Sequence, residues 1–156
     1  MEFISKNSNY TNRWLGHFLR FVQEYKLFDT KTPLLLTVSG GVDSMALLFA
    51  LKRIQRYGYS NSLRVVHINH ATRDGQDAEE KFVHQFCEAL EISCETVKLD
   101  NLNPDQNFEF QARVKRYDAF YELAQPKELI VLAHHLDDSF EWTMLQSLRS
   151  ASIEGL

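Results

Sequence analysis

The chain has 156 residues, of which 44% are hydrophobic, and it carries a formal net charge of −4. This length suits one domain with its own core, and no apolar run approaches the roughly 20 residues of a membrane-spanning helix. The charge gives no overall attraction to nucleic acid, which disfavours an RNA partner without excluding one, because a local basic patch can still dominate binding. The first residues, Met1 to Lys6, lack the pattern of a secretory signal, which predicts a cytoplasmic protein without a membrane partner.

Strand-like and helical patterns alternate along the chain. An amphipathic helix over residues 12–27 comes first, and its apolar stripe is expected to pack against the rest: Trp14, Leu15, Phe18, Leu19, Phe21 and Val22. Further patterns predict strands at 34–38, 63–68, 94–99 and 129–133, and helices at 42–57, 76–91, 106–124 and 136–149. This order predicts an α/β fold with a doubly wound, mostly parallel sheet and helices on both faces. We expect a helical segment over 1–32 and one compact domain over 33–156.

A glycine-rich segment follows the first predicted strand and precedes a predicted helix: Ser39, Gly40, Gly41, Val42, Asp43 and Ser44. A strand that turns sharply into a helix directs backbone N–H groups and the positive end of the helix dipole at one point, which suits a phosphate. Hydroxyl groups add donors, and Asp43 adds a carboxylate for Mg²⁺. The alternative is an ordinary turn, because Gly and Ser favour turns anyway.

This segment resembles the SGGxDS signature of the PP-loop, or N-type, ATP pyrophosphatases. The resemblance implies an adenine nucleotide α hydrolase-like fold and cleavage of ATP between its α and β phosphates. The family includes GMP, NAD and asparagine synthetases and several tRNA-modifying enzymes. The motif therefore indicates the nucleotide chemistry and not the acceptor.

A second polar cluster, His67 to Arg73, follows the second predicted strand. In a parallel sheet the loops after Val38, Ile68 and Ala133 open at one edge, where α/β proteins bind ligands. We expect His67 and Asn69 to contact the nucleotide, Asn69 by hydrogen bonds to the adenine edge; each residue alone also fits an ordinary loop. The HxNHxxR pattern resembles the tRNA(Ile)-lysidine synthetases and their 2-thiocytidine relatives.

A third cluster, His134 to Glu141, follows the last predicted strand. Asp138 and Glu141 are three residues apart, so they share a face of the expected helix and form an acidic pocket. As isolated residues, acidic groups in a first turn are explained by the helix dipole. The AHHxDDxxE pattern resembles that of the lysidine synthetases, which implies that Asp138 and Glu141 bind the amino groups of free lysine.

Two arginines, Arg113 and Arg116, lie on the predicted helix 106–124, whose apolar face is expected to contain Phe110, Val114, Tyr117 and Phe120. Forked hydrogen bonds suit them to a phosphate, to the lysine carboxylate or to RNA, whereas two helical arginines alone usually form a solvated face. The ARxxRY spacing resembles that of the same family and implies an active-site arginine. Arg113 is preferred and Arg116 comes second.

The resemblance implies a ligase that joins free lysine to the wobble cytidine of an isoleucine tRNA with a CAU anticodon, using ATP and Mg²⁺. Catalysis is expected from Asp43, Arg113, Asp138 and Glu141, with His134 or a carboxylate as proton acceptor. Lysidine synthetases continue past the position of Leu156 into tRNA-binding regions, so we expect either part of a longer enzyme or a short form. The residues leave the oligomeric state open, a homodimer included.

Two alternatives stay open. A 2-thiocytidine synthetase-like enzyme shares the same activation step but uses CxxC cysteines, whereas Cys87 and Cys94 are seven residues apart and are expected to be reduced and structural. A nucleotide-binding module without catalysis is suggested by Arg149-Ser150-Ala151-Ser152, which replaces an RGSG-like turn and lacks its glycines.

Overall fold

The computed structural model describes residues 9–69, 76–99, 108–134 and Met144. The order of elements within these ranges matches the predicted alternation of strands and helices, with ends that differ by a few residues. The elements are α1 (Asn9–Glu24), β1 (Leu34–Val38), α2 (Val42–Ile54), the 3-10 turn η2 (Gln55–Tyr57), β2 (Leu63–Asn69), α3 (Gln76–Ala89), β3 (Ser93–Lys98), α4 (Phe108–Leu123) and β4 (Leu129–Leu132). The predicted helix 136–149 lies outside the described residues, apart from Met144.

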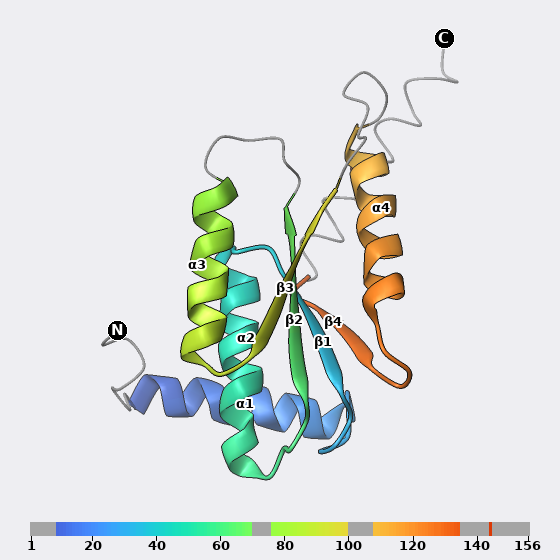
Figure 1. Cartoon of the computed structure of the whole chain (residues 1–156). Coiled ribbons are helices and arrows are strands. Elements are labelled where there is room, and N and C mark those ends of the chain that lie inside the picture. The colour runs from blue at the N-terminus through green and yellow to red at the C-terminus, as the bar shows by residue number, and fades with distance from the viewer. Residues whose placement is uncertain (1–8, 70–75, 100–107, 135–143, 145–156) are drawn as a thin grey trace.

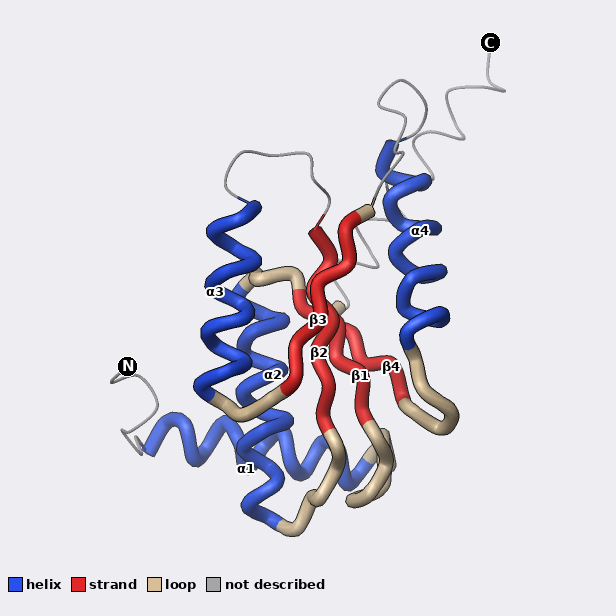
Figure 2. Tube along the Cα trace, in the orientation of Figure 1, coloured by secondary structure: helices blue, strands red, loops and turns tan. Residues whose placement is uncertain are grey.

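The four strands form a parallel sheet in the order β3-β2-β1-β4. Helices α1, α2 and α3 lie on one face of this sheet, and α4 lies on the other (Figures 1 and 2). The prediction of a parallel sheet covered on both faces is therefore confirmed. Among the described helices, none combines the length and apolarity needed to cross a membrane.

Strand β1 lies inside the sheet between β2 and β4, and all five of its residues are buried. Leu34 and Leu36 face the core beneath α2 and α3, whereas Leu35 faces the core beneath α4. A strand covered on both faces needs apolar side chains on both, which explains the uninterrupted apolar run. Its carboxyl end is thereby held rigidly where the glycine-rich segment begins.

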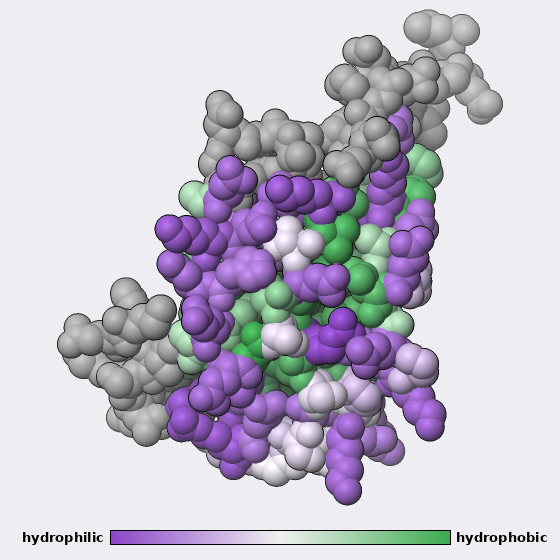
Figure 3. Space-filling view, in the orientation of Figure 1, coloured by the Kyte–Doolittle hydropathy of each residue, from purple (hydrophilic) through white to green (hydrophobic). Residues whose placement is uncertain are grey.

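Helix α4 packs on the sheet with only part of the predicted apolar face, the part that contains Tyr117 and Phe120. Phe120 and Ala112 are buried, but Phe110 is 52% exposed and Val114 is 42% exposed. The prediction for Phe110 and Val114 was wrong because α4 carries apolar residues around its whole circumference, so their spacing does not single out one inner face. The apolar surface in Figure 3 gathers between the sheet and this helix.

Helix α1 also buries only part of its predicted stripe. Leu15 and Val22 are each 1% exposed, whereas Trp14 and Phe21 lie at the surface. The prediction that the whole stripe packs inside was wrong for these two aromatic residues. One line of side chains is enough to seat α1 against α2, and the aromatic residues flank that line.

Candidate nucleotide site

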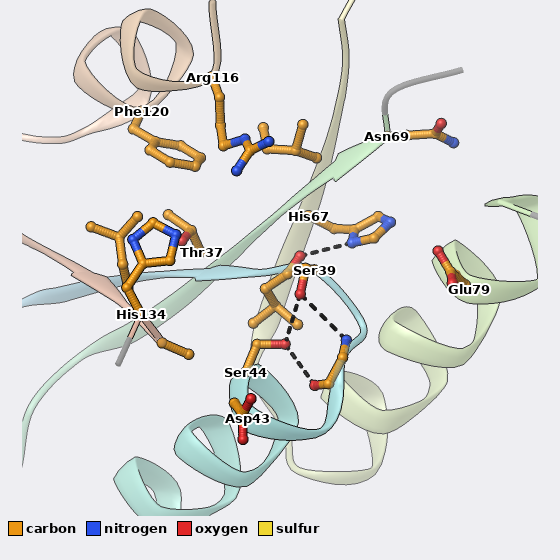
Figure 4. A pocket seen from close by; sticks show the side chains of 15 residues that line it. Thr37, Ser39, Asp43, Ser44, His67, Asn69, Glu79, Arg116, Phe120 and His134 are labelled. Carbon is orange, nitrogen blue, oxygen red and sulfur yellow. Dashed lines mark hydrogen bonds between the residues drawn. The ribbon is translucent and has the colours of Figure 1, made fainter. Parts of the chain in front are cut away.

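Three hydrogen bonds form a closed ring in the loop between β1 and α2. The backbone N–H of Gly41 donates to Ser39 Oγ at 3.3 Å, and Ser44 Oγ donates to the carbonyl oxygen of Gly41 at 2.9 Å (Figure 4). The two serine hydroxyls are 3.3 Å apart. Because the proton of Ser44 is used on Gly41, Ser39 is the donor between the hydroxyls. The serines therefore fix the shape of the loop, in addition to the phosphate contacts expected of them.

Helix α2 begins at this loop with its N-terminus open. Gly41 is the N-cap, and among the described residues no side chain caps the helix there. The first N–H groups of a helix need acceptors from outside the helix, and the dipole favours a negative one. The geometry therefore fits an anion such as a phosphate at this end of α2.

Gly40 and Gly41 serve the loop differently. Gly40 has φ +84°, a left-handed conformation that side chains other than glycine rarely adopt, and it packs near Glu79 and Val83 of α3. Gly41 has φ −68° and ψ 159°, which any residue adopts. Among the described residues, a Cβ at Gly41 would have Ser39 Oγ, at 3.4 Å, as its one neighbour within 4 Å. Gly40 is thus needed for the backbone, and Gly41 for the open space beside the helix end.

His67 is buried at the end of β2 and contacts the end of β1. Its Nδ1 lies 2.8 Å from the carbonyl oxygen of Val38, the residue that faces it across the sheet (Figure 4). Since a carbonyl only accepts, Nδ1 carries a proton and donates it to Val38. The bond locks the two strand ends together directly before the glycine-rich loop.

Asn69, the last residue of β2, is held by α3. Its side-chain amide donates to Glu80 at 2.8 Å. This hydrogen bond, with others from Thr96 and the positive charge of Lys98, lowers the pKa of Glu80 despite the opposing effect of burial. Asn69 lines the cavity, but one of its amide hydrogens is occupied by Glu80, a partner that the sequence did not reveal.

Of the two arginines on α4, Arg116 lines the cavity and Arg113 does not. The guanidinium of Arg113 lies 5.3 Å from the ring centre of Tyr117, a cation–π distance. The side chain of Arg116 projects from α4 toward Ser39 and His67 (Figure 4). Burial and the nearby positive charge of Arg113 lower the pKa of Arg116. The geometry favours Arg116 over Arg113 as the arginine that meets an anion.

The carboxyl ends of β1, β2 and β4 converge on a cavity of about 440 Å³, as expected for the ends of parallel strands. Val38, Ile68 and Ala133 all line it. Asp43 and His134 lie on its wall as predicted, and Glu79 of α3 adds a carboxylate that sequence reasoning missed. The volume is within the range of small-molecule sites. Asp138, Glu141, His70 and Arg73 lie outside the described residues, so their places remain predictions.

A family model for the PP-loop domain matches residues 11–156. The chain belongs to the PP-loop family. This membership implies ATP binding, which agrees with an open helix N-terminus at the carboxyl edge of the sheet.

Curated proteins similar to this PP-loop chain are named tRNA(Ile)-lysidine synthase. One from Petrotoga mobilis is 36% identical over 144 residues, which cover 88% of this chain and 46% of the relative. One from Actinobacillus pleuropneumoniae serotype 3 is 37% identical over 129 residues, covering 83% of this chain and 29% of the relative. The chain thus spans less than half the length of these relatives.

Two solved structures share the PP-loop fold. The U34-tRNA thiolase NcsA from Methanococcus maripaludis superposes with a TM-score of 0.60 at 15% identity, over 78% of this chain and 45% of the thiolase. The NH3-dependent NAD synthetase from Campylobacter jejuni gives a TM-score of 0.54 at 16% identity, over 76% of this chain and 54% of the synthetase. At these identities the similarity shows the fold alone.

Proposed function

We propose that this chain carries out the ATP-dependent chemistry of lysidine formation, in which free lysine is joined to the wobble cytidine of an isoleucine tRNA with a CAU anticodon. The names of the curated relatives support this reaction, and so does the sequence from His134 to Glu141. The observation that carries the proposal is the open N-terminus of α2 at the cavity, because it supplies the site at which ATP is activated.

The chain's own groups divide the binding of ATP between two walls of the cavity. The N–H groups at the start of α2 hold phosphate oxygens from one side, and Arg116 approaches from α4 on the other. Fixed donors on both sides stabilise the negative charge that develops on the departing pyrophosphate. Asp43, in the first turn of α2, fits a Mg²⁺ ion beside the phosphates, where the ion would neutralise their charge.

The reaction proceeds in two displacements. The carbonyl oxygen of the cytosine attacks the α phosphorus of ATP, and pyrophosphate leaves. The ε-amine of lysine then attacks the ring carbon that bears this oxygen, the carbon–oxygen bond breaks, and AMP leaves. The amine must first be neutral, and His134 at the cavity wall or a carboxylate takes the proton that is lost. We assign the binding of lysine to Asp138 and Glu141.

Lysine-dependent release of AMP tests this function. The purified chain, incubated with ATP, Mg²⁺ and the isoleucine tRNA transcript, is expected to release AMP and to incorporate labelled lysine into the RNA. Asp138→Asn should abolish incorporation while leaving the affinity for ATP nearly unchanged. Binding of ATP without any AMP release, with lysine and tRNA present, would instead favour a nucleotide-binding module without catalysis.

Sulfur transfer to the same base is the second candidate function. The positions of the two cysteines disfavour it. Cys87 on α3 is buried and Cys94 on β3 is half-buried, in the core beneath α2 and α3. Their thiols hydrogen-bond to each other, which raises the pKa of Cys94 and lowers that of Cys87. Neither belongs to the described residues that line the cavity, so neither is placed to deliver sulfur to an activated base.

A further inference from the structure

The two cysteines of the chain face each other at the junction of α3 and β3. Cys87 lies near the end of α3 and is 1% exposed, and Cys94 lies near the start of β3 and is half-buried. Both thiols are free, and they hydrogen-bond to each other in the core beneath α2 and α3. A single buried cysteine behaves as a small apolar residue, whereas two thiols in direct contact form a pair that can be oxidised together.

The turn between α3 and β3 brings the two thiols together. The N–H of Ile92 donates to the carbonyl oxygen of Cys87 at 3.0 Å, so the chain reverses directly after the helix (Figure 1). A second contact joins the same two elements, because His84 Nε2 lies 2.8 Å from Thr96 Oγ1. His84 precedes Cys87 by three residues on one helix face, and Thr96 follows Cys94 by two residues on one strand face. The thiol contact is therefore one of two successive links between α3 and β3.

Helix α3 also borders the glycine-rich loop of the nucleotide site. Val83, about one turn before Cys87, is fully buried, and a Cβ at Gly40 would lie 3.6 Å from its Cγ2. Glu79, about one turn earlier again, lines the cavity. Strand β2 separates β3 from β1, so a pull on α3 toward β3 is a pull away from the loop that follows β1.

We propose that Cys87 and Cys94 are a reversible redox site, in which a peroxide converts the two thiols into an intramolecular disulfide and this bond weakens the binding of ATP. The disulfide itself rests on the thiol contact alone, whereas its effect on ATP rests on the nucleotide site proposed above. A disulfide holds its sulfur atoms about 2.05 Å apart, much closer than a hydrogen bond does, so the end of α3 is drawn toward β3. Because packed interiors transmit strain, Val83 moves with the helix and the packing of Gly40 is disturbed.

Two thiols and one molecule of hydrogen peroxide balance the oxidation. The hydrogen bond from Cys94 lowers the pKa of Cys87 despite the opposing effect of burial, which makes Cys87 the thiolate that reacts. Its sulfur attacks one oxygen of the peroxide, the oxygen–oxygen bond breaks, and the hydroxide that leaves takes up the Cys87 proton as water. The sulfur of Cys94 then attacks the sulfenic acid at Cys87, the sulfur–oxygen bond breaks, and the Cys94 proton leaves with that oxygen as a second water. The thiols lose two electrons to the peroxide, and a reducing thiol reverses the bond by exchange.

Mass spectrometry and a non-reducing gel test the formation of the disulfide. The purified chain treated with hydrogen peroxide should lose two hydrogen atoms and both free thiols, remain a single chain on the gel, and return to its original state with dithiothreitol. Cys94→Ser removes the second thiol, so Cys87 should instead gain oxygen as a sulfenic or sulfinic acid. Thiols that stay free in the folded chain, or a disulfide that forms only between chains, would overturn the redox site.

Calorimetric titration with ATP and Mg²⁺ tests the effect on the nucleotide site. The oxidised chain should bind ATP about threefold more weakly or worse than the reduced chain, and dithiothreitol should restore the affinity. The matched control is the double variant Cys87→Ser with Cys94→Ser, whose affinity should not respond to peroxide; it also reports any effect of oxidation at the three methionines. A disulfide that leaves ATP affinity unchanged would overturn the link to the loop. A reduced chain that binds no ATP would contradict the nucleotide site, while the mass measurement still decides the disulfide by itself.

Discussion

Gly40 and Gly41 stand side by side, but the same substitution should affect them in opposite ways. Gly40→Ser forces a side chain into a left-handed conformation and should lower the free energy of unfolding by about 1 to 2 kcal/mol. Gly41→Ser keeps an allowed conformation at an N-cap, where serine is favoured, and should not destabilise the fold. Its hydroxyl would occupy N–H groups of α2, so ATP affinity should fall by about tenfold or more.

Urea unfolding and calorimetric titration with ATP separate the two effects. A Gly41→Ser variant that binds ATP as well as the unmodified chain would contradict the assignment of the phosphates to the N-terminus of α2. Normal stability of Gly40→Ser would show that the positive φ at this position is dispensable.

We expect His67 to stabilise the fold through one of its two ring nitrogens, Nδ1, which bonds to the carbonyl oxygen of Val38. His67→Asn retains an N–H near the position of Nδ1 and can still donate to the carbonyl oxygen of Val38, so its unfolding free energy should change by less than about 1 kcal/mol. His67→Leu leaves that buried carbonyl without its donor and should cost about 1 to 3 kcal/mol. Equal losses in urea unfolding would show that the hydrogen bond is not what stabilises the strand ends.

At the scale of the elements, Glu80 ties α3 to the ends of β2 and β3. Its pKa is lowered in the folded protein, so the unfolded chain binds more protons as the pH falls through the acid range, and the stabilisation by Glu80 is lost there. Glu80→Gln should therefore destabilise the protein by about 1 kcal/mol near pH 7. Unfolding followed from pH 7 downward should show this difference shrinking below about pH 4; a difference that grows on acidification would contradict the assigned direction.

The sequence predicts elements better than it predicts their faces. Strand β1 was found at its predicted bounds, 34–38, because a strand buried on both sides leaves a short apolar run, here between Pro33 and the glycine-rich loop. The inner face of α4 was found only in part: Phe120 was expected on it and is buried, but Ala112 was not expected, because apolar residues surround the helix and do not single out one face. That same rotation of α4 determines which arginine enters the cavity. Arg113 and Arg116 differ by less than one turn, so spacing alone cannot choose between them.

Within the candidate site, the loop was predictable and its internal bonding was not. The residue types from Ser39 to Ser44, and their position between a strand and a helix, predicted an anion site. The ring of hydrogen bonds that holds Ser39, Ser44 and Gly41 together depends on side-chain rotation, which leaves no trace in the sequence. The role of Glu80 was not predicted either, because its partner Asn69 is eleven residues away in the sequence and meets it only in the folded protein.

At the scale of the whole molecule, the cavity joins segments that are far apart in the sequence: the β1–α2 loop, the end of β2, and α4. A ligand that binds all three stabilises the fold as one unit, by about 2.7 kcal/mol when its concentration is a hundred times its dissociation constant. For a chain of this length that stabilisation corresponds to a rise in Tm of about 5 to 10 °C. Thermal unfolding with and without ATP and Mg²⁺ measures it.

The contribution of α4 to this stabilisation should depend on Arg116. Arg116→Gln removes the cation that faces the loop and should reduce the ATP-dependent rise in Tm by more than half, whereas Arg113→Gln should reduce it less, because Arg113 lies against Tyr117. Arg53→Gln on α2 is the matched control, since Arg53 lies over the ring of Phe49 and is not among the described residues of the cavity wall. A larger loss for Arg113→Gln than for Arg116→Gln would mean that the phosphates are met by the other side of α4.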